Sequence, residues 1–255
     1  MGGDLPLLLD AARDAAKIAM GFWGNDPKSW TKGEGSPVTE ADIAVDDFLR
    51  ARLTGARPGY GWLSEETPDD SARLDADHCF IVDPIDGTRA FARAEKWWAH
   101  SIAVARGGQI TAAVVYLPAA DRMYAAARGE GATLNGAPVR VSGCADPEGA
   151  EVLGPSSLCK APRWTGTAPA FNTHFRPALA WRLALVAEGR FDAVMTFGDA
   201  WEWDIAAGAL LVAEAGGRAT PPGRPPHSFN SETRRAPGYL AANPALHKAI
   251  GDRLA

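Results

Sequence analysis

The chain has 255 residues, and its 26 Lys and Arg against 31 Asp and Glu give a formal net charge of −5. This mild acidity, without a basic block, argues against binding to a nucleic-acid polymer. No apolar run reaches the roughly 20 residues of a membrane span, and three scattered cysteines favour neither a disulfide framework nor a zinc site. We therefore expect a soluble, cytoplasmic protein that binds neither nucleic acid nor membrane.

Two helices and a loop are expected at the start of the chain. Apolar residues at helical spacing predict an amphipathic helix over Leu5–Met20. The stretch Asn25–Pro37 is rich in Gly, Ser, Lys and Pro, and it predicts a mobile loop. A second helix should begin at Thr39, which is a good N-cap and is followed by Asp42 in the first turn.

A buried strand and a series of further strands come next. The apolar run Cys79–Val82 suits a strand that is buried on both faces and that stops at Asp83-Pro84. A helix is expected from near Thr88. The segment Trp98–Val141 predicts a meander of strands, because turns rich in Gly, Pro and Asn-Gly divide it.

The second half of the chain alternates helices and strands. The expected helices are Pro177–Gly189, Trp203–Ala215 and a segment starting at Pro244, and the expected strands are Phe191–Phe197 and Tyr239–Ala242. This alternation predicts an α/β arrangement, whereas the first half is typical of α+β. We therefore divide the chain into residues 1–145, which carry most of the acidic motifs, and residues 146–255, which should complete the active site.

The hexapeptide Asp83-Pro84-Ile85-Asp86-Gly87-Thr88 is the sharpest chemical feature. Its two carboxylates stand where a buried strand should end, and its glycine permits a close approach of the backbone. The helix expected from Thr88 would offer free N–H groups to an anion. Metal-holding acids beside such a helix start suit phosphoryl transfer. An Asx turn with a helix cap would use the same residue types.

Two other acidic sites strengthen the chemical interpretation. Glu65 and Glu66 follow an apolar run, although a solvated loop would also carry them. Asp204 starts a predicted helix, where an acid ordinarily serves as an N-terminal cap. Together with Asp83 and Asp86 these acids could form an all-oxygen cage, which favours Mg²⁺ or Mn²⁺ over zinc.

Six groups of residues occur in an informative order along the chain. They are Thr39-Glu40-Ala41-Asp42, Leu63-Ser64-Glu65-Glu66, Asp83-Pro84-Ile85-Asp86-Gly87-Thr88, Gly129-Glu130-Gly131-Ala132 with Asn135-Gly136, Leu185-Val186-Ala187-Glu188-Gly189 and Trp203-Asp204-Ile205-Ala206-Ala207-Gly208. This set strongly resembles the inositol monophosphatase superfamily of metal-dependent, lithium-sensitive phosphatases over nearly the whole chain. The resemblance implies a layered αβαβα sandwich, a phosphoric monoester hydrolase that uses two to three Mg²⁺ ions with Mn²⁺ as a substitute, and a homodimer.

The resemblance also implies roles for individual residues. The implied metal ligands are Glu65, Asp83, the Ile85 carbonyl, Asp86 and Asp204. Thr88, paired with Asp42, would orient the attacking water, and Glu65 would help to activate it. The backbone N–H groups of Gly87 and Thr88 would hold the phosphate. These roles agree with the chemistry, because a phosphate dianion repels hydroxide unless nearby charge is neutralised.

The substrate is less well defined by the sequence. At the position before the Glu pair, Ser64 resembles the 3'(2'),5'-bisphosphate nucleotidase branch. The sequence of the hexapeptide, in contrast, is closer to that of the inositol and histidinol phosphatases. Phe197 stands where animal-type inositol monophosphatases have an inositol-contacting Glu, and it could stack on a base or simply pack at a strand end. Arg89 could reach a second phosphate or be an ordinary surface residue.

These observations predict a phosphomonoesterase that acts on a small phosphorylated metabolite. The best candidates are a 3'(2'),5'-bisphosphate nucleotide and inositol monophosphate, with histidinol phosphate or a sugar phosphate as alternatives. A rival class is a non-catalytic regulatory protein on the same scaffold. The presence of all five implied side chains, Glu65, Asp83, Asp86, Thr88 and Asp204, argues against that class.

Overall fold

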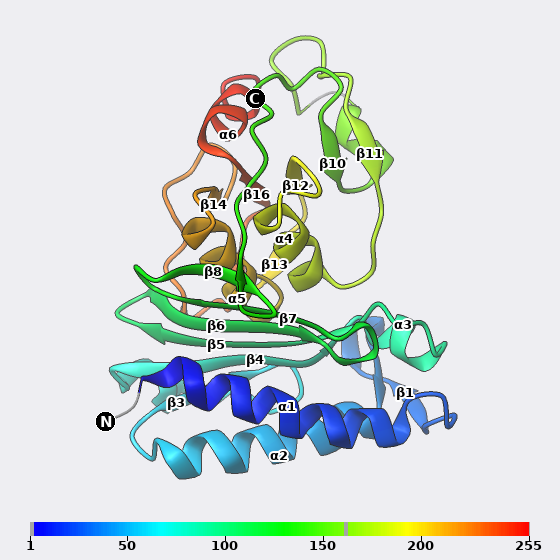
Figure 1. Ribbon diagram of the computed structural model, residues 1–255, viewed down its shortest axis with the longest axis vertical. Helices are drawn as coiled ribbons and strands as arrows, with labels where there is room; N and C mark the ends of the chain where they lie inside the picture. The colour runs from blue at the N-terminus through cyan, green and yellow to red at the C-terminus, as the bar shows by residue number, and fades with distance from the viewer. Residues whose placement is uncertain (1–2, 161–162, 255) are drawn as a thin grey trace.

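The computed structural model describes residues 3–160 and 163–254, which form five stacked layers (Figure 1). The outer helices α1 (Asp4–Phe22) and α2 (Glu40–Ala56) cover a seven-stranded sheet. The helices α4 (Leu179–Ala187) and α5 (Glu202–Glu214) separate this sheet from a five-stranded one, and α6 (Pro244–Gly251) lies beyond it. This mixed α/β sandwich confirms the predicted αβαβα arrangement.

The larger sheet follows the order of the chain. Its strands are β3 (Gly61–Ser64), β4 (His78–Asp86), β5 (Ala99–Arg106), β6 (Gln109–Leu117), β7 (Arg122–Ala127), β8 (Gly131–Leu134) and β9 (Ala137–Pro138). Only β3 and β4 are parallel among these neighbours, and the rest form the predicted antiparallel meander. Asn135 and Gly136 both have positive φ in the turn between β8 and β9, which explains the Asn-Gly pair at this point.

The smaller sheet is assembled from segments far apart in sequence. Its order is β11 (Asn172–His174), β10 (Glu151–Leu153), β12 (Ala193–Thr196), β16 (Tyr239–Ala242) and β14 (Arg218–Thr220). β10 is parallel to both β11 and β12, whereas β16 is antiparallel to β12 and β14. The short strands β13 (Ala200–Trp201) and β15 (Arg235–Ala236) form a separate antiparallel pair.

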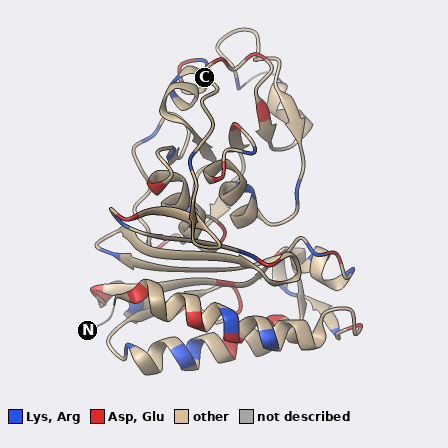
Figure 2. Ribbon diagram, in the orientation of Figure 1, with Lys and Arg blue, Asp and Glu red and all other residues tan. Residues whose placement is uncertain are grey.

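The distribution of charged side chains distinguishes the helices that face solvent from the helix that both sheets cover. Figure 2 shows Lys, Arg, Asp and Glu alternating along α1 and α2. α5 is apolar over most of its length, because both sheets cover it. Gly208 allows α4 to approach α5 closely, since a Cβ at this position would lie 2.4 Å from the Cβ of Leu183. None of the helices in the described residues is long and apolar enough to cross a membrane.

Two expectations for local structure were wrong. The segment predicted to be a loop contains a hairpin of β1 (Ser29–Thr31) and β2 (Pro37–Thr39), although its composition is typical of loops. β4 continues to Asp86 instead of stopping at Asp83. The register with β5 shifts between these two residues, and the parallel partner β3 already ends opposite Val82, so Pro84 removes no hydrogen bond from that ladder.

Candidate active site

The parallel pair of β3 and β4 brings the first two acids together. Ser64 is in register with Val82, so Glu65 and Asp83 leave the sheet at the same edge. The amide of Glu65 donates to the carbonyl of Val82 at 3.2 Å and continues this pairing by one residue. The neighbouring strand ends therefore place both carboxyl groups on one side of the sheet.

Asp83 also shapes the backbone that follows it. Its Oδ1 accepts a 2.9 Å hydrogen bond from the amide of Ile85, which is the Asx turn anticipated as a structural alternative. The side chain is buried, with 2% of its residue surface exposed. The turn and the acidic site are compatible, because a carboxylate oxygen can accept more than one bond and the second oxygen is free of the turn.

α5 contributes the third acid from its first turn. The ligand atoms of Glu65, Asp83 and Asp204 all lie within 4.8 Å of one another, close enough to hold one metal ion. Asp204 is not the helix cap, because the N-cap position belongs to Trp201. We call Glu65, Asp83 and Asp204 the acidic cluster.

Burial and mutual repulsion raise the free energy of the acidic cluster when its carboxyl groups are ionised. Burial raises the pKa of Asp83 well above its ordinary value, and the charges of Glu65, Asp86 and Asp204 raise it further. The pKa of Asp204 is also raised, first by burial and then by Asp86 and Glu65. A cation among these groups would relieve the repulsion.

Asp86 lies next to the cluster but faces a helix end. Its two carboxylate oxygens accept hydrogen bonds from the amides of Leu179, at 3.1 Å, and Ala180, at 2.6 Å, at the start of α4. Burial raises the pKa of Asp86 to about 7, although these two amides and Arg182 oppose the rise. Asp86 therefore ties α4 to the end of β4.

Thr88 and Asp42 form a buried hydroxyl–carboxylate pair. The Oγ1 of Thr88 lies 3.0 Å from Oδ1 of Asp42 and 3.2 Å from the carbonyl of Ile85. Asp42 also forms a capping box with the predicted N-cap Thr39, and burial raises its pKa to about 6. Thr88 does not cap the helix α3 (Thr88–Ala92), because the N-cap is Gly87, whose φ of 97° suits glycine.

Lys32 bridges the two glutamates after β3. Its Nζ lies 3.1 Å from Glu65 and 2.8 Å from both oxygens of Glu66. The side chain of Glu66 is 1% exposed, and burial raises its pKa to about 7. The alternative of a solvated glutamate pair therefore does not hold.

The acidic cluster lies in a cavity of about 540 Å³. Arg89, Arg93 and Arg182 also line it, together with the exposed Phe175 and with Trp201 and Trp203, whose rings stack 4.5 Å apart. Arg182 was missed by sequence reasoning, although a single charge within the apolar helix α4 was a usable signal. Its Nε donates to the carbonyl of Arg176 at 2.5 Å.

Phe197, which could have stacked on a base, lies outside this lining, as do Trp97 and Trp98. Phe197 packs edge-on against Trp164, with the guanidinium of Arg163 at 4.6 Å from its ring centroid. Trp97 stacks on Trp181, and Trp98 is fully buried. For Phe197 the structure thus shows packing at a strand end.

An αβαβα sandwich with a buried carboxylate cluster at its strand ends defines a class of proteins suited to metal-assisted chemistry. The model of the inositol monophosphatase family matches residues 5–254, so the chain belongs to this family of phosphatases and is itself such an enzyme.

Three relatives illustrate the match. An inositol-1-monophosphatase of Mesorhizobium japonicum is 39% identical over 199 residues, covering 73% of this chain and 72% of the relative. An inositol-1-monophosphatase of Caulobacter vibrioides is 34% identical over 266 residues, covering 97% and 99%. The solved structure of a Thermotoga maritima IMPase superposes with a TM-score of 0.82 at 25% identity, covering 97% and 95%.

Proposed function

We propose that this phosphatase hydrolyses a small phosphate monoester with the help of Mg²⁺, which Mn²⁺ can replace. The observation that carries the proposal is the acidic cluster, because its three carboxylates offer only oxygen atoms within 4.8 Å of one another. Hard divalent cations prefer such donors. The raised pKa values of Asp83 and Asp204 further support a cation as the missing partner.

The proposed ligands come from three segments of the chain. They are the acidic cluster Glu65, Asp83 and Asp204, with Asp86 and the Ile85 carbonyl as additional ligands. When bound, the cations would neutralise the phosphate and lower the pKa of the attacking water. Asp86 can serve in this way while it holds α4, because each carboxylate oxygen has two lone pairs.

Thr88 and Asp42 are proposed to orient the water that attacks phosphorus. In this role Thr88 accepts from the water with its oxygen while its own proton is donated to Asp42, which is 3.0 Å away. The backbone N–H groups of Gly87 and Thr88 would bind the phosphate at the start of α3. Glu65 would assist in activating the same water, because it lines the same cavity as Thr88.

The cavity supports a substrate with more than one anionic group. Arg89 of α3 and Arg93, which directly follows this helix, line it, and Arg182 adds a third guanidinium. We therefore place a 3'(2'),5'-bisphosphate nucleotide first and inositol monophosphate second, with histidinol phosphate and sugar phosphates as alternatives. The stacked pair Trp201 and Trp203 offers a flat apolar wall for a base.

A phosphate-release panel tests the proposal. Adenosine 3',5'-bisphosphate, inositol 1-phosphate, histidinol phosphate and fructose 1,6-bisphosphate are compared with Mg²⁺, with Mn²⁺ and with EDTA. We expect release only with divalent cations, and inhibition by millimolar Li⁺, which takes oxygen ligands but carries half the charge. Full activity in EDTA contradicts metal dependence, and no release from any ester favours a regulatory role.

The proposed homodimer requires a separate measurement. Light scattering on the eluting protein gives its molar mass, which should be twice the 26.9 kDa of the chain.

A further inference from the structure

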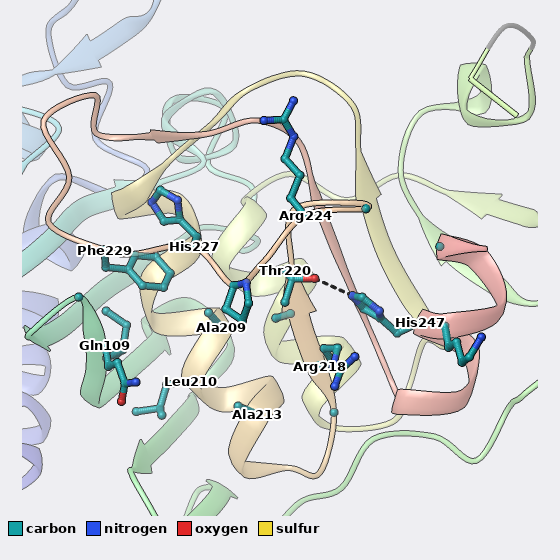
Figure 3. A pocket seen from close by; sticks show the side chains of 18 of the residues that line it. Gln109, Ala209, Leu210, Ala213, Arg218, Thr220, Arg224, His227, Phe229 and His247 are labelled. Carbon is teal, nitrogen blue, oxygen red and sulfur yellow. Dashed lines mark hydrogen bonds between the residues drawn. The ribbon is translucent and has the colours of Figure 1, made fainter. Parts of the chain in front are cut away.

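A second cavity lies on the far part of α5 and shares no lining residue with the acidic one. Its volume is about 600 Å³, within the range of small-molecule sites. α5 supplies Ala209, Leu210 and Ala213 to its floor, whereas Asp204 of the acidic cluster lies near the other end of this helix. We call this space the distal cavity (Figure 3).

The distal cavity is strongly cationic although the chain is acidic overall. Three arginines and one lysine line it, against one aspartate. Lys248 is neutralised by that aspartate, Asp252, at 2.6 Å, and Arg128 donates to the carbonyl of Ile110. The guanidinium groups of Arg218 and Arg224 make no hydrogen bond or ion pair within the described residues. Figure 3 shows Arg224 pointing away from Arg218, so of these two guanidinium groups the one of Arg218, near His247, is available to an anion beside Thr220.

Polar and apolar groups are arranged around the same space. Figure 3 shows Arg218 and His247 on one side of Thr220, and His227 and Phe229 on the other. The hydroxyl of Thr220 lies 2.9 Å from Nε2 of His247, a buried pair. Phe229 packs edge-on against His227, 5.0 Å between ring centroids. One side thus suits an anionic group and the other suits a ring.

The loop that carries His227 is fixed by a buried carboxylate. Glu202, fully buried at the first position of α5, accepts from His227 at 2.8 Å and from the amides of Asn230 and Ser231. This anchoring keeps the aromatic wall in place without a ligand. A preorganised wall lowers the entropy cost of binding.

We propose that the distal cavity is a second ligand site, which binds a small organic phosphate. Its phosphate would pair with Arg218, beside Thr220 and His247, and its ring would pack between Phe229 and the apolar floor of α5. Inorganic phosphate alone would bind more weakly, because it leaves the apolar part of the cavity unfilled.

Calorimetry with adenosine 5'-monophosphate as the probe tests this site. The titration is done in EDTA, where the carboxylates of the acidic cluster oppose anion binding, so it does not depend on catalysis. We expect Arg218→Glu to weaken binding about tenfold or more, since it reverses a contacting charge. The matched control Arg52→Glu, on an exposed position of α2, should bind like the unmodified protein.

Two further measurements locate the probe. Hydrogen exchange should slow in residues 218–229 and stay unchanged in residues 83–88, and adenosine without its phosphate should bind much more weakly. The proposal is wrong if adenosine monophosphate, glucose 6-phosphate and phenyl phosphate all fail to bind at about 5 mM, a free energy near −3 kcal/mol. Binding that Arg218→Glu leaves unchanged also contradicts it.

Discussion

Asp83 accepts a backbone hydrogen bond with one oxygen and contributes its charge to the acidic cluster. Asp83→Asn keeps the acceptor for the amide of Ile85 and removes only the charge. We expect phosphate release at ordinary Mg²⁺ to fall by about 10²-fold or more. Without metal, the variant should melt no lower than the unmodified protein, because a repulsive buried charge is lost. Asp77→Asn, at an exposed site before β4, is the control.

Variants at Thr88 distinguish a catalytic role of its hydroxyl from a purely structural one. Thr88→Ala should lower kcat by about 10²- to 10⁴-fold with little change in KM, because the backbone N–H groups remain. Thr88→Ser should restore most of the rate, since it keeps the hydroxyl near Asp42. Asp42→Asn should resemble Thr88→Ala, and the double variant should be far from additive. A large fall in Tm with near-normal turnover in Thr88→Ala would contradict the catalytic role of Thr88.

Arg89 is proposed to recognise the second phosphate of a bisphosphate substrate. Arg89→Ala should raise KM for adenosine 3',5'-bisphosphate about tenfold and leave inositol 1-phosphate within about twofold, since only the former has the extra anion. Steady-state kinetics on both substrates measure the difference. Equal changes for the two esters contradict a selective contact, and Arg52→Ala controls for a general loss of positive charge.

The start of α4 contains backbone strain. Ala178, its N-cap, has φ of 63°, a conformation that costs a non-glycine residue roughly 1–2 kcal/mol. Ala178→Gly should therefore raise the free energy of unfolding by up to about 1 kcal/mol after its greater unfolded-state entropy is counted. Urea unfolding measures the change. Ala51→Gly, on the exposed side of α2, should instead destabilise by a similar amount, and a loss at both positions contradicts the strain.

The elements with strong local signals were predicted best from the sequence. Thr39 is the N-cap of α2 as expected, with Asp42 in the first turn, and the apolar run before Asp83 forms a buried strand. The positions of side chains relative to distant parts of the chain were harder to predict. Arg182 reaches the cavity because α4 packs on Asp86. Phe197 packs against Trp164. Both positions depend on tertiary packing. The hairpin around Lys32 likewise depends on contacts with distant residues, above all Glu66.

The whole molecule should lose stability with rising pH when no metal is present. The folded-state pKa is raised to about 6 in Asp42 and about 7 in Asp86 and Glu66, mainly by burial. The folded state therefore binds more protons than the unfolded chain, and stability declines as pH rises from about 4 through about 7. His100 and His247, with pKa lowered to about 4, act in the opposite direction below about pH 7.

Thermal melts in EDTA at pH 6 and pH 8 measure this effect. We expect the lower Tm at pH 8, and the histidines can only reduce the difference. Mg²⁺ should raise Tm more at pH 8 than at pH 6, because metal binding competes with protons for the same carboxylates. A metal-free Tm that rises toward pH 8 would contradict the burial of ionised acids.

The sandwich order also has a consequence for folding during synthesis. β9 ends at Pro138, but α5, which covers the inner face of the seven-stranded sheet, ends at Glu214, 76 positions later. At about 5–20 residues per second, the ribosome needs roughly 4–15 s to make that stretch. During this interval the face carrying Val115 and Tyr124 has α1 and α2 behind it and lacks its cover in front, until first α4 and then α5 are made. The nascent chain is therefore most exposed to aggregation and most dependent on chaperones halfway through its synthesis.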